Sequence, residues 1–307
     1  REIGWGLIYA YKSLTTVKNT VFENITSQYA TAIYSEDDKL TVLNSKFINL
    51  FAKNTAGAIG LKTTKSVNIE NCSFIHTESC KNGGAIYADL NGDNVTTEYS
   101  VTVKNSLFKN CSSEFGGAYL QLGGQINIID TELLNNVAEY SGGAIYLSNT
   151  SSLIGNSAIN NNKAKYFYGG AVFIDDSESK VTSCDIKNNT AGTTGSGIYL
   201  YDTKYEIKNT LFEKNSNAVI VSYFDKKGSS LTNNELNGGK TLLNQVEYTS
   251  VVDYKGKKII LKPVKVKETA KSSKFDLRDY NLAGIVKDQG SMGSCWAFAA
   301  TGALESA

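Results

Sequence analysis

The sequence predicts an all-β protein built as a parallel β-helix, in which the chain winds through coils of about 26 residues. Two phrases that recur in step, and an alternation of apolar with polar residues, carry this prediction. The first phrase, Gly-Gly-Ala-Ile-Tyr, occurs at residues 83–87 and 142–146, with variants at 116–120, 169–173 and 195–199. A fixed period of about 20–50 residues is typical of solenoids.

The third residue of each copy, weaker copies included, gives the period. These residues are Gly6, Ala32, Ala58, Ala85, Ala118, Ala144, Ala171 and Gly197, at intervals of 26, 26, 27, 33, 26, 27 and 26. About eight coils follow, and the strand spacing of ~4.8 Å gives them a length of roughly 40 Å. The one long interval predicts a protruding loop near residues 88–100.

Each coil is expected to hold two or three short strands. Apolar residues alternate in segments such as Val67-x-Ile69 and Val101-x-Val103, which is strand spacing. Helical repeats need a period of about 3.6 residues, which is absent, and leucine-rich repeats need a Leu-x-x-Leu-x-Leu pattern, which is also absent. A parallel β-helix fits best.

The second phrase, Asn-x-x-[Phe/Leu/Ile]-x-Asn, predicts stacked columns of side chains. Its apolar column predicts an internal stack that is rich in phenylalanine, and its asparagine columns predict amide ladders at the turns. The apolar column is Phe22, Phe47, Phe74, Phe108, Leu133, Ile159, Ile186 and Phe212. The last polar column is Asn24, Asn49, His76, Asn110, Asn135, Asn161, Asn188 and Lys214. The single histidine is therefore interpreted as a substituted ladder position and not as a catalytic base.

Charge and hydropathy exclude several classes of protein. The chain has 31 Lys+Arg and 30 Asp+Glu, a net charge of +1, which argues against a nucleic-acid partner. No run approaches the roughly 18 apolar residues of a membrane span, so no transmembrane segment is expected in this chain. No signal peptide is visible at its start.

Cysteines of the repeat region are interpreted as packing residues. Cys72 and Cys184 share a column four coils apart, about 19 Å by the strand spacing, which is too far for a disulfide. Both are expected to be buried. Cys80 and Cys111 lie on adjacent coils in different columns, so a bond between them stays open.

Acidic residues follow several of the repeated strands and admit two interpretations. They are Asp37, Asp38, Asp89, Asp175, Asp176 and Asp202, whereas other coils carry Thr63 or Asn149. Glycoside-cleaving enzymes use paired carboxylates, but solvated turns also favour aspartate. No run of alternating oxygen ligands predicts a Ca²⁺ site.

Composition divides the chain into four parts. Residues 1–244 carry the β-helix repeats, and 245–262 are expected to form a β-hairpin that caps the last coil. Residues 263–274 contain the only proline and many charges, which is typical of a linker. Residues 275–307 differ in kind from everything before them.

Three blocks of the last part resemble the start of papain-like cysteine peptidases: Phe-Asp-Leu-Arg at 275–278, Val-Lys-Asp-Gln-Gly at 286–290 and Gly-Ser-Cys-Trp-Ala-Phe at 293–298. The resemblance implies that Cys295 is the nucleophile and that the Gln289 side-chain amide helps to hold the oxyanion. Residues 296–306 are expected to be helical. Cys295 would then lie at the helix N-terminus with Ser294 as N-cap, where the helix dipole favours a thiolate.

This part departs from the family's pattern at three points. Met292 stands where the family usually has a disulfide-forming cysteine, and no helical pro-segment precedes Phe275. The family's His and Asn lie about 130–150 residues after the nucleophile, and His76 cannot replace them. We therefore expect the chain to be a fragment of a longer product and to be inactive alone.

The repeats themselves resemble those of polymorphic outer-membrane proteins and adhesin-like prokaryotic surface proteins. That resemblance implies a right-handed, pectin-lyase-like β-helix and an extracellular or cell-surface location. The combined expectation is a surface or secreted cysteine peptidase that cleaves peptide bonds through an acyl-enzyme and carries a β-helix for adhesion or spacing.

The expected partners are a protein or peptide substrate and a cell-surface glycan or protein that binds the β-helix; no cofactor or metal is expected. One alternative is an adhesin with a degenerate peptidase domain. A weaker alternative is a polysaccharide-active β-helix with a groove of carboxylates from Asp37, Asp89, Asp175 or Asp202.

Overall fold

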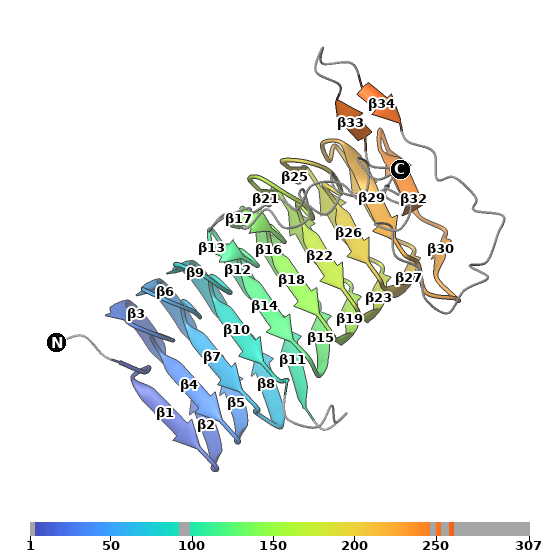
Figure 1. The fold of residues 1–307 in the computed structure, drawn as a ribbon. Coiled ribbons are helices and arrows are strands. Elements are labelled where there is room, and N and C mark those ends of the chain that lie inside the picture. The colour runs from blue at the N-terminus through green and yellow to red at the C-terminus, as the bar shows by residue number, and fades with distance from the viewer. Residues whose placement is uncertain (1–3, 92–98, 246–249, 253–257, 261–307) are drawn as a thin grey trace, which may run out of the picture. The chain divides into compact units, whose positions relative to one another are not determined.

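The computed structural model describes residues 4–91, 99–245, 250–252 and 258–260. The chain divides into two compact units, Arg1–Glu247 and Tyr248–Ala307. Within the first unit, the chain winds as a parallel β-solenoid with three sheets along its length (Figure 1). The predicted all-β parallel β-helix is confirmed. No helix in the described part of the chain is long and apolar enough to span a membrane.

Each sheet takes one strand, or a pair of short strands, from each of nine coils, and the first sheet has one further strand. The first sheet comprises β1 (Ile8–Tyr11), β4 (Ile33–Glu36), β7 (Ile59–Lys62), β10 (Ile86–Asp89), β14 (Tyr119–Leu122), β18 (Ile145–Ser148), β22 (Val172–Asp175), β26 (Ile198–Tyr201), β29 (Ala218–Tyr223) and β32 (Lys240–Gln245). The second comprises β2 (Leu14–Lys18), β5 (Lys39–Leu43), β8 (Ser66–Glu70), β11 (Ser100–Lys104), β15 (Gln125–Ile129), β19 (Ser151–Gly155), β23 (Glu178–Thr182), β27 (Lys204–Lys208) and β30 (Ser230–Thr232).

The third sheet begins with three long strands and continues with shorter strands, most of them in pairs. The long strands are β3 (Val21–Ser27), β6 (Lys46–Ala52) and β9 (Ser73–Ser79). The shorter ones are β12 (Leu107–Lys109), β13 (Ser112–Phe115), β16 (Glu132–Leu134), β17 (Val137–Ser141), β20 (Ala158–Asn160), β21 (Lys163–Ala164), β24 (Asp185–Lys187), β25 (Thr190–Ala191), β28 (Leu211–Glu213) and β31 (Glu235–Asn237). The first and second sheets hold ten and nine strands, more than the eight coils that the phrases indicate. The additional coil lies beyond residue 217, where the phrases are no longer recognisable although the strands continue.

The predicted aromatic stack runs through the interior of the solenoid. The ring centroids of Phe22 and Phe47 lie 5.1 Å apart, and those of Phe47–Phe74 and Phe74–Phe108 each lie 4.6 Å apart. The aliphatic members of the column and Phe212 are also buried. Parallel in-register pairing places equivalent side chains above one another, so the stack is confirmed.

Paired glycines solve two different steric problems at each turn into the first sheet. Gly83 has a φ of 62°, a conformation that side chains with a Cβ disfavour. Gly84 has an ordinary φ, but a Cβ there would collide with the carbonyl oxygen of Gly117 on the next coil. The first glycine makes the turn and the second allows neighbouring coils to approach.

Asparagines of the recurring phrase lie at turns with left-handed backbone. Asn44 and Asn49, for example, have φ values of 49° and 52°, which asparagine tolerates better than most residues. Some amides contact the next coil: Asn49 Nδ2 donates to Asn24 Oδ1 at 3.2 Å, and Asn71 Nδ2 donates to Asn44 Oδ1 at 3.2 Å.

A run of amide contacts also lies inside the solenoid, one residue further along the chain than the predicted column. Asn136 Nδ2 donates to Asn162 Oδ1 at 3.0 Å, Asn162 donates to Asn189 at 3.1 Å, and Asn189 donates to Asn215 at 3.0 Å. Asn136, Asn162 and Asn189 are fully buried. The preceding asparagine takes the left-handed turn, and this turn directs the next side chain inward.

The predicted loop and hairpin are described in part. Ala88 and Asp89 belong to β10 and Ser100 begins β11, so the insertion is shorter than residues 88–100, and residues 92–98 lie outside the described part. Within residues 245–262, β33 (Ser250–Val252) pairs antiparallel with β34 (Lys258–Ile260). The linker at 263–274 and the segment at 275–307 lie outside the described residues.

Candidate functional site

The two residues that the sequence predicts as catalytic, Cys295 and Gln289, lie outside the described residues, as does the expected helix at 296–306. The site that the structure does describe is a polar cluster on the solenoid. It forms where strands of the first sheet turn toward the second, at the carboxylates for which the sequence left two interpretations open.

The register of the strands in the first sheet shows which of these carboxylates lie close together. Asp89 and Asp175 belong to one column of strand ends but lie three coils apart, roughly 14 Å by the strand spacing. Asp37 lies five coils from Asp176, roughly 24 Å away. Asp175, Asp176 and Asp202 lie on neighbouring coils. The structure therefore brings these three together and leaves Asp37 and Asp89 elsewhere.

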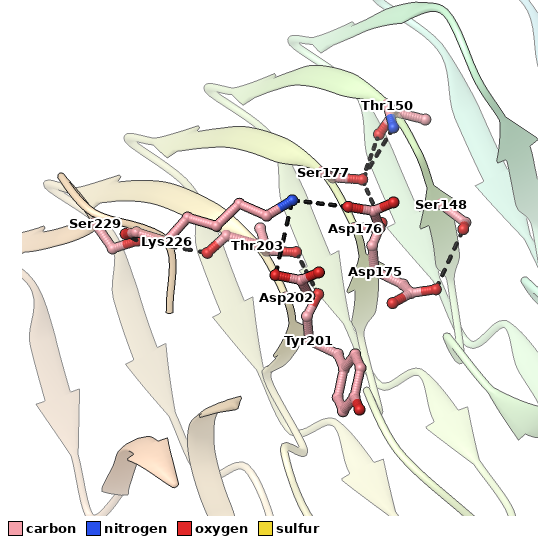
Figure 2. Close-up of polar contacts among 10 residues, drawn as sticks. All are labelled: Ser148, Thr150, Asp175, Asp176, Ser177, Tyr201, Asp202, Thr203, Lys226 and Ser229. Atoms are coloured by element: carbon pink, nitrogen blue, oxygen red, sulfur yellow. Dashed lines mark hydrogen bonds and ion pairs between the residues drawn. The ribbon is translucent and has the colours of Figure 1, made fainter. Parts of the chain in front are cut away.

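A lysine that the sequence analysis missed bridges two of the three carboxylates (Figure 2). Lys226 Nζ lies 2.7 Å from Asp176 Oδ1 and 3.8 Å from Asp202 Oδ1. The hydrogen bond to Asp176 is the main factor that raises the pKa of Lys226, and the charges of the neighbouring aspartates add to it. The ammonium group thus pairs with carboxylates on two neighbouring coils.

The third carboxylate has a different environment. Burial raises the pKa of Asp175, the neighbouring charges of Asp176 and Asp202 raise it further, and the hydrogen bond that Ser148 Oγ donates at 3.3 Å lowers it. The pKa of Asp175 therefore lies above the ordinary value of an aspartate. Figure 2 shows Asp175 directed toward Ser148, while Asp176 is directed toward Lys226.

Hydroxyl groups complete one wall of the cluster. The backbone N–H of Thr150 donates to Ser177 Oγ at 3.0 Å, and Ser177 Oγ donates to the carbonyl of Asp175 at 2.5 Å. A groove of about 460 Å³ lies beside them. Its polar lining includes Gln125, Asn149, Asp176, Glu178, Lys204 and Lys226.

Charges of both signs and several hydrogen-bonding groups line this groove. Glycoside cleavage needs one carboxyl that is protonated and a second that is ionised beside it. Asp37 and Asp89 lie on coils distant from Asp175 and Asp202. In the cluster itself, Asp176 and Asp202 both lie close to Lys226. No group of three metal-binding side chains occurs among the described residues.

Histidine 76 takes the ladder position that the repeat indicates. Its φ is 52°, like that of the asparagines in the same column, and Asn110 Nδ2 lies 3.3 Å from His76 Nε2. The interpretation of His76 as a substituted turn residue is confirmed.

The four cysteines of the described chain are free thiols, and three are buried as packing residues. Burial is the main cause that raises the pKa of Cys111 and Cys184 to about 11 and also raises the pKa of Cys72. The expected burial of Cys72 and Cys184 is confirmed. The bond left open between Cys80 and Cys111 is not formed, and Cys80 is exposed.

Parallel coils with three sheets define the class of this chain as a β-helix solenoid. The chain belongs to the right-handed β-helix family: the family model described as "Right handed beta helix region" matches residues 94–256, more than half of the sequence. A second model, "Papain family cysteine protease", matches residues 270–307. A papain-family segment therefore follows the β-helix.

Two curated proteins are similar to the C-terminal part of the chain. Cysteine proteinase 1 of Zea mays is 64% identical over 33 residues, which are 11% of this chain and 9% of that protein. The viral cathepsin of Mamestra configurata nucleopolyhedrovirus is 66% identical over 32 residues, 10% of each chain. The matches span about a tenth of the length of these relatives. No solved structure matches the chain.

Proposed function

We propose that this chain forms part of a papain-like cysteine peptidase whose nucleophile is Cys295. The observation that carries the proposal is the Gly-Ser-Cys-Trp-Ala-Phe block at residues 293–298, which lies inside the papain-family match and has Gln289 six residues before the cysteine. Identities of 64% and 66% to a cysteine proteinase and a viral cathepsin support the same assignment.

In the proposed reaction, the Cys295 thiolate attacks the carbonyl carbon of a peptide bond. The carbonyl oxygen becomes an oxyanion, and the Gln289 amide stabilises it. The C–N bond then breaks, the amine leaves with a proton, and a thioester remains on Cys295. Water hydrolyses this thioester, which releases the acid and restores the thiol.

The reaction requires a base to take the thiol proton. His76 is the only histidine of the chain, and its ring nitrogen contacts Asn110 in a turn of the solenoid. The proposal therefore calls for an imidazole supplied by sequence beyond this chain, at the family's usual distance of about 130–150 residues after the cysteine.

We also propose that the β-helix acts outside the cell, as a spacer or adhesion domain for the peptidase. The resemblance of its repeats to those of adhesin-like surface proteins supports this location, and its length of many stacked coils suits a spacer. Fractionation of the source cells, with an antibody against the solenoid, tests it: the proposal expects signal at the surface or in the medium, and signal confined to the cytosol would contradict it.

Covalent labelling of the whole gene product tests the assignment of the nucleophile. A peptidyl epoxide, which alkylates activated thiolates, should label Cys295, and Cys295→Ala should remove the label. Cys80→Ser is the matched control because Cys80 is the exposed thiol of the described chain. In this variant Cys295 should still be labelled. Labelling that survives in Cys295→Ala would refute the assignment.

A further inference from the structure

A column of aromatic side chains on the outer face of the first sheet is interrupted by a glycine. In register, the column reads Tyr9, Tyr34, Gly60, Tyr87, Leu120, Tyr146, Phe173, Tyr199 and Val221. Aromatic neighbours in this column stack, as at Tyr146–Phe173, with ring centroids 4.6 Å apart. Between Tyr34 and Tyr87, two coils apart, no side chain occupies the intermediate position.

The interruption opens a small hollow of about 160 Å³, which we name the Gly60 hollow. Its walls are the side chains of Trp5, Tyr29, Tyr34, Tyr87, Lys62 and Asp89. Trp5 stacks on Tyr29 with centroids 4.6 Å apart and meets Tyr34 edge-on at 4.7 Å. The volume is below the roughly 300 Å³ of a site for a drug-sized ligand, so the hollow suits one small group.

The absence of a side chain at Gly60 allows the Tyr34 ring and the Ala30 methyl group to lie against the floor of the hollow. A Cβ at residue 60 would lie 3.0 Å from Tyr34 Cδ2 and 3.1 Å from the Ala30 Cβ, closer than ordinary side-chain contacts. A larger residue would push the Tyr34 ring out of its place in the wall of the hollow.

Two charged side chains line the hollow, Lys62 and Asp89, and Glu36 lies beside Lys62. Lys62 Nζ forms an ion pair with Glu36 Oε1 at 3.0 Å, and the Tyr9 hydroxyl donates to the other oxygen of Glu36 at 3.1 Å. Asp89 makes no ion pair within the part of the chain that the structure describes. With Lys62 held by Glu36, the hollow presents the Asp89 carboxylate beside aromatic faces, and Lys62, Glu36 and Asp89 together carry one negative charge.

The tyrosine rings remain neutral in this field. Burial, followed by the charge of nearby carboxylates, raises the pKa of Tyr34 to about 12 and that of Tyr87 to about 12. The Asp89 carboxylate is among the contributing charges at both rings. Neutral phenol and indole faces attract cations through their quadrupole.

We propose that the Gly60 hollow binds a quaternary ammonium group, with its methyl groups against Trp5, Tyr34 and Tyr87 and its charge facing Asp89. Such a cation is weakly hydrated and matches both the aromatic walls and the negative charge. A neutral apolar group would leave the carboxylate partly desolvated and unpaired, and an anion would be repelled. This inference is independent of the proposed peptidase activity.

Calorimetric titration of the full chain with choline tests the proposal. Choline should bind at one saturable site, and 3,3-dimethyl-1-butanol, its neutral isostere, should bind at least about tenfold more weakly. Quenching of Trp5 fluorescence, identified with Trp5→Phe because Trp296 is the second tryptophan, should follow the same curve. Equal affinity for the two compounds, or no saturable binding of choline, would overturn the proposal.

Matched variants place the binding in the hollow. Gly60→Ala should weaken choline binding about tenfold or more by displacing the Tyr34 ring, whereas Gly155→Ala, on a strand of the second sheet where a Cβ would lie 3.3 Å from Ile129 Cδ1, should not. Asp89→Asn should also weaken choline binding, while Asp130→Asn, at an exposed turn with a φ of 50°, should leave it unchanged.

Glucose is the competing probe: saturable glucose binding in place of choline would assign the hollow to a sugar ring and overturn the cation proposal.

Discussion

The five cysteines lie in two regions of this chain, in which the thiol has different roles. In the solenoid, Cys72, Cys111 and Cys184 are buried in the core, and burial disfavours their thiolate form. In the C-terminal segment, Cys295 stands in a block whose resemblance implies an ionised nucleophile. The comparison teaches that the same side chain serves packing or chemistry according to its surroundings.

The largest effect on stability is expected from the interior column of the solenoid. Phe74→Ala removes a fully buried ring from a stack with neighbours at 4.6 Å on both sides. The free energy of unfolding should fall by about 3–5 kcal/mol. Phe167→Ala, whose side chain is 46% exposed, should change it by less than about 1 kcal/mol. Chemical denaturation of both variants measures the difference, and equal costs would contradict the solenoid packing.

The second prediction concerns the C-terminal region, where substitutions should alter chemistry and leave the solenoid intact. In the whole gene product, Gln289→Ala should lower kcat for peptide hydrolysis by about 10²–10³, because one oxyanion donor is lost. Lys287→Ala, in the same block, serves as the control and should leave kcat within a few-fold. An unchanged kcat in Gln289→Ala would remove Gln289 from the proposed site.

The smallest effect is a pH dependence of the solenoid thiols. The pKa of Cys184 is raised from 9.0 to about 11, so the stability it contributes is present below about pH 9 and is lost as pH rises through about 11. The loss is about 3 kcal/mol. Cys184→Ala should flatten the fall in unfolding free energy over this range, whereas Cys80→Ala, at an exposed thiol, should not. Identical slopes for the two variants would contradict the assigned burial.

The period of the sequence was sufficient to predict the solenoid, its stacked phenylalanines and the turn position of His76, because in-register coils repeat the same environment. The buried amide ladder was harder to place. Asparagine doublets such as Asn161–Asn162 offer two candidates, and only the backbone shows that the first takes a φ of 58° and the second points inward. Alternation alone does not contain this information.

The sequence did not predict the Lys226 cluster or the Gly60 hollow, because both depend on residues outside the repeated pattern. Lys226 lies past the point where the phrases fade, so no column aligned it with Asp176 and Asp202. Gly60 was recognised only as part of a weak copy of the repeat, and its meaning depends on the rings of the neighbouring coils. Contacts made between coils by non-repeating residues need the structure.

The measurement that tests the central claim most directly is the rate of peptide hydrolysis by the whole gene product with and without Cys295. Cys295→Ala should lower kcat/KM by about 10³ or more, while Cys80→Ser retains the full rate and both variants keep the unfolding profile of the solenoid. A Cys295→Ala protein that hydrolyses peptides as fast as the parent would contradict the assignment of Cys295 as the nucleophile.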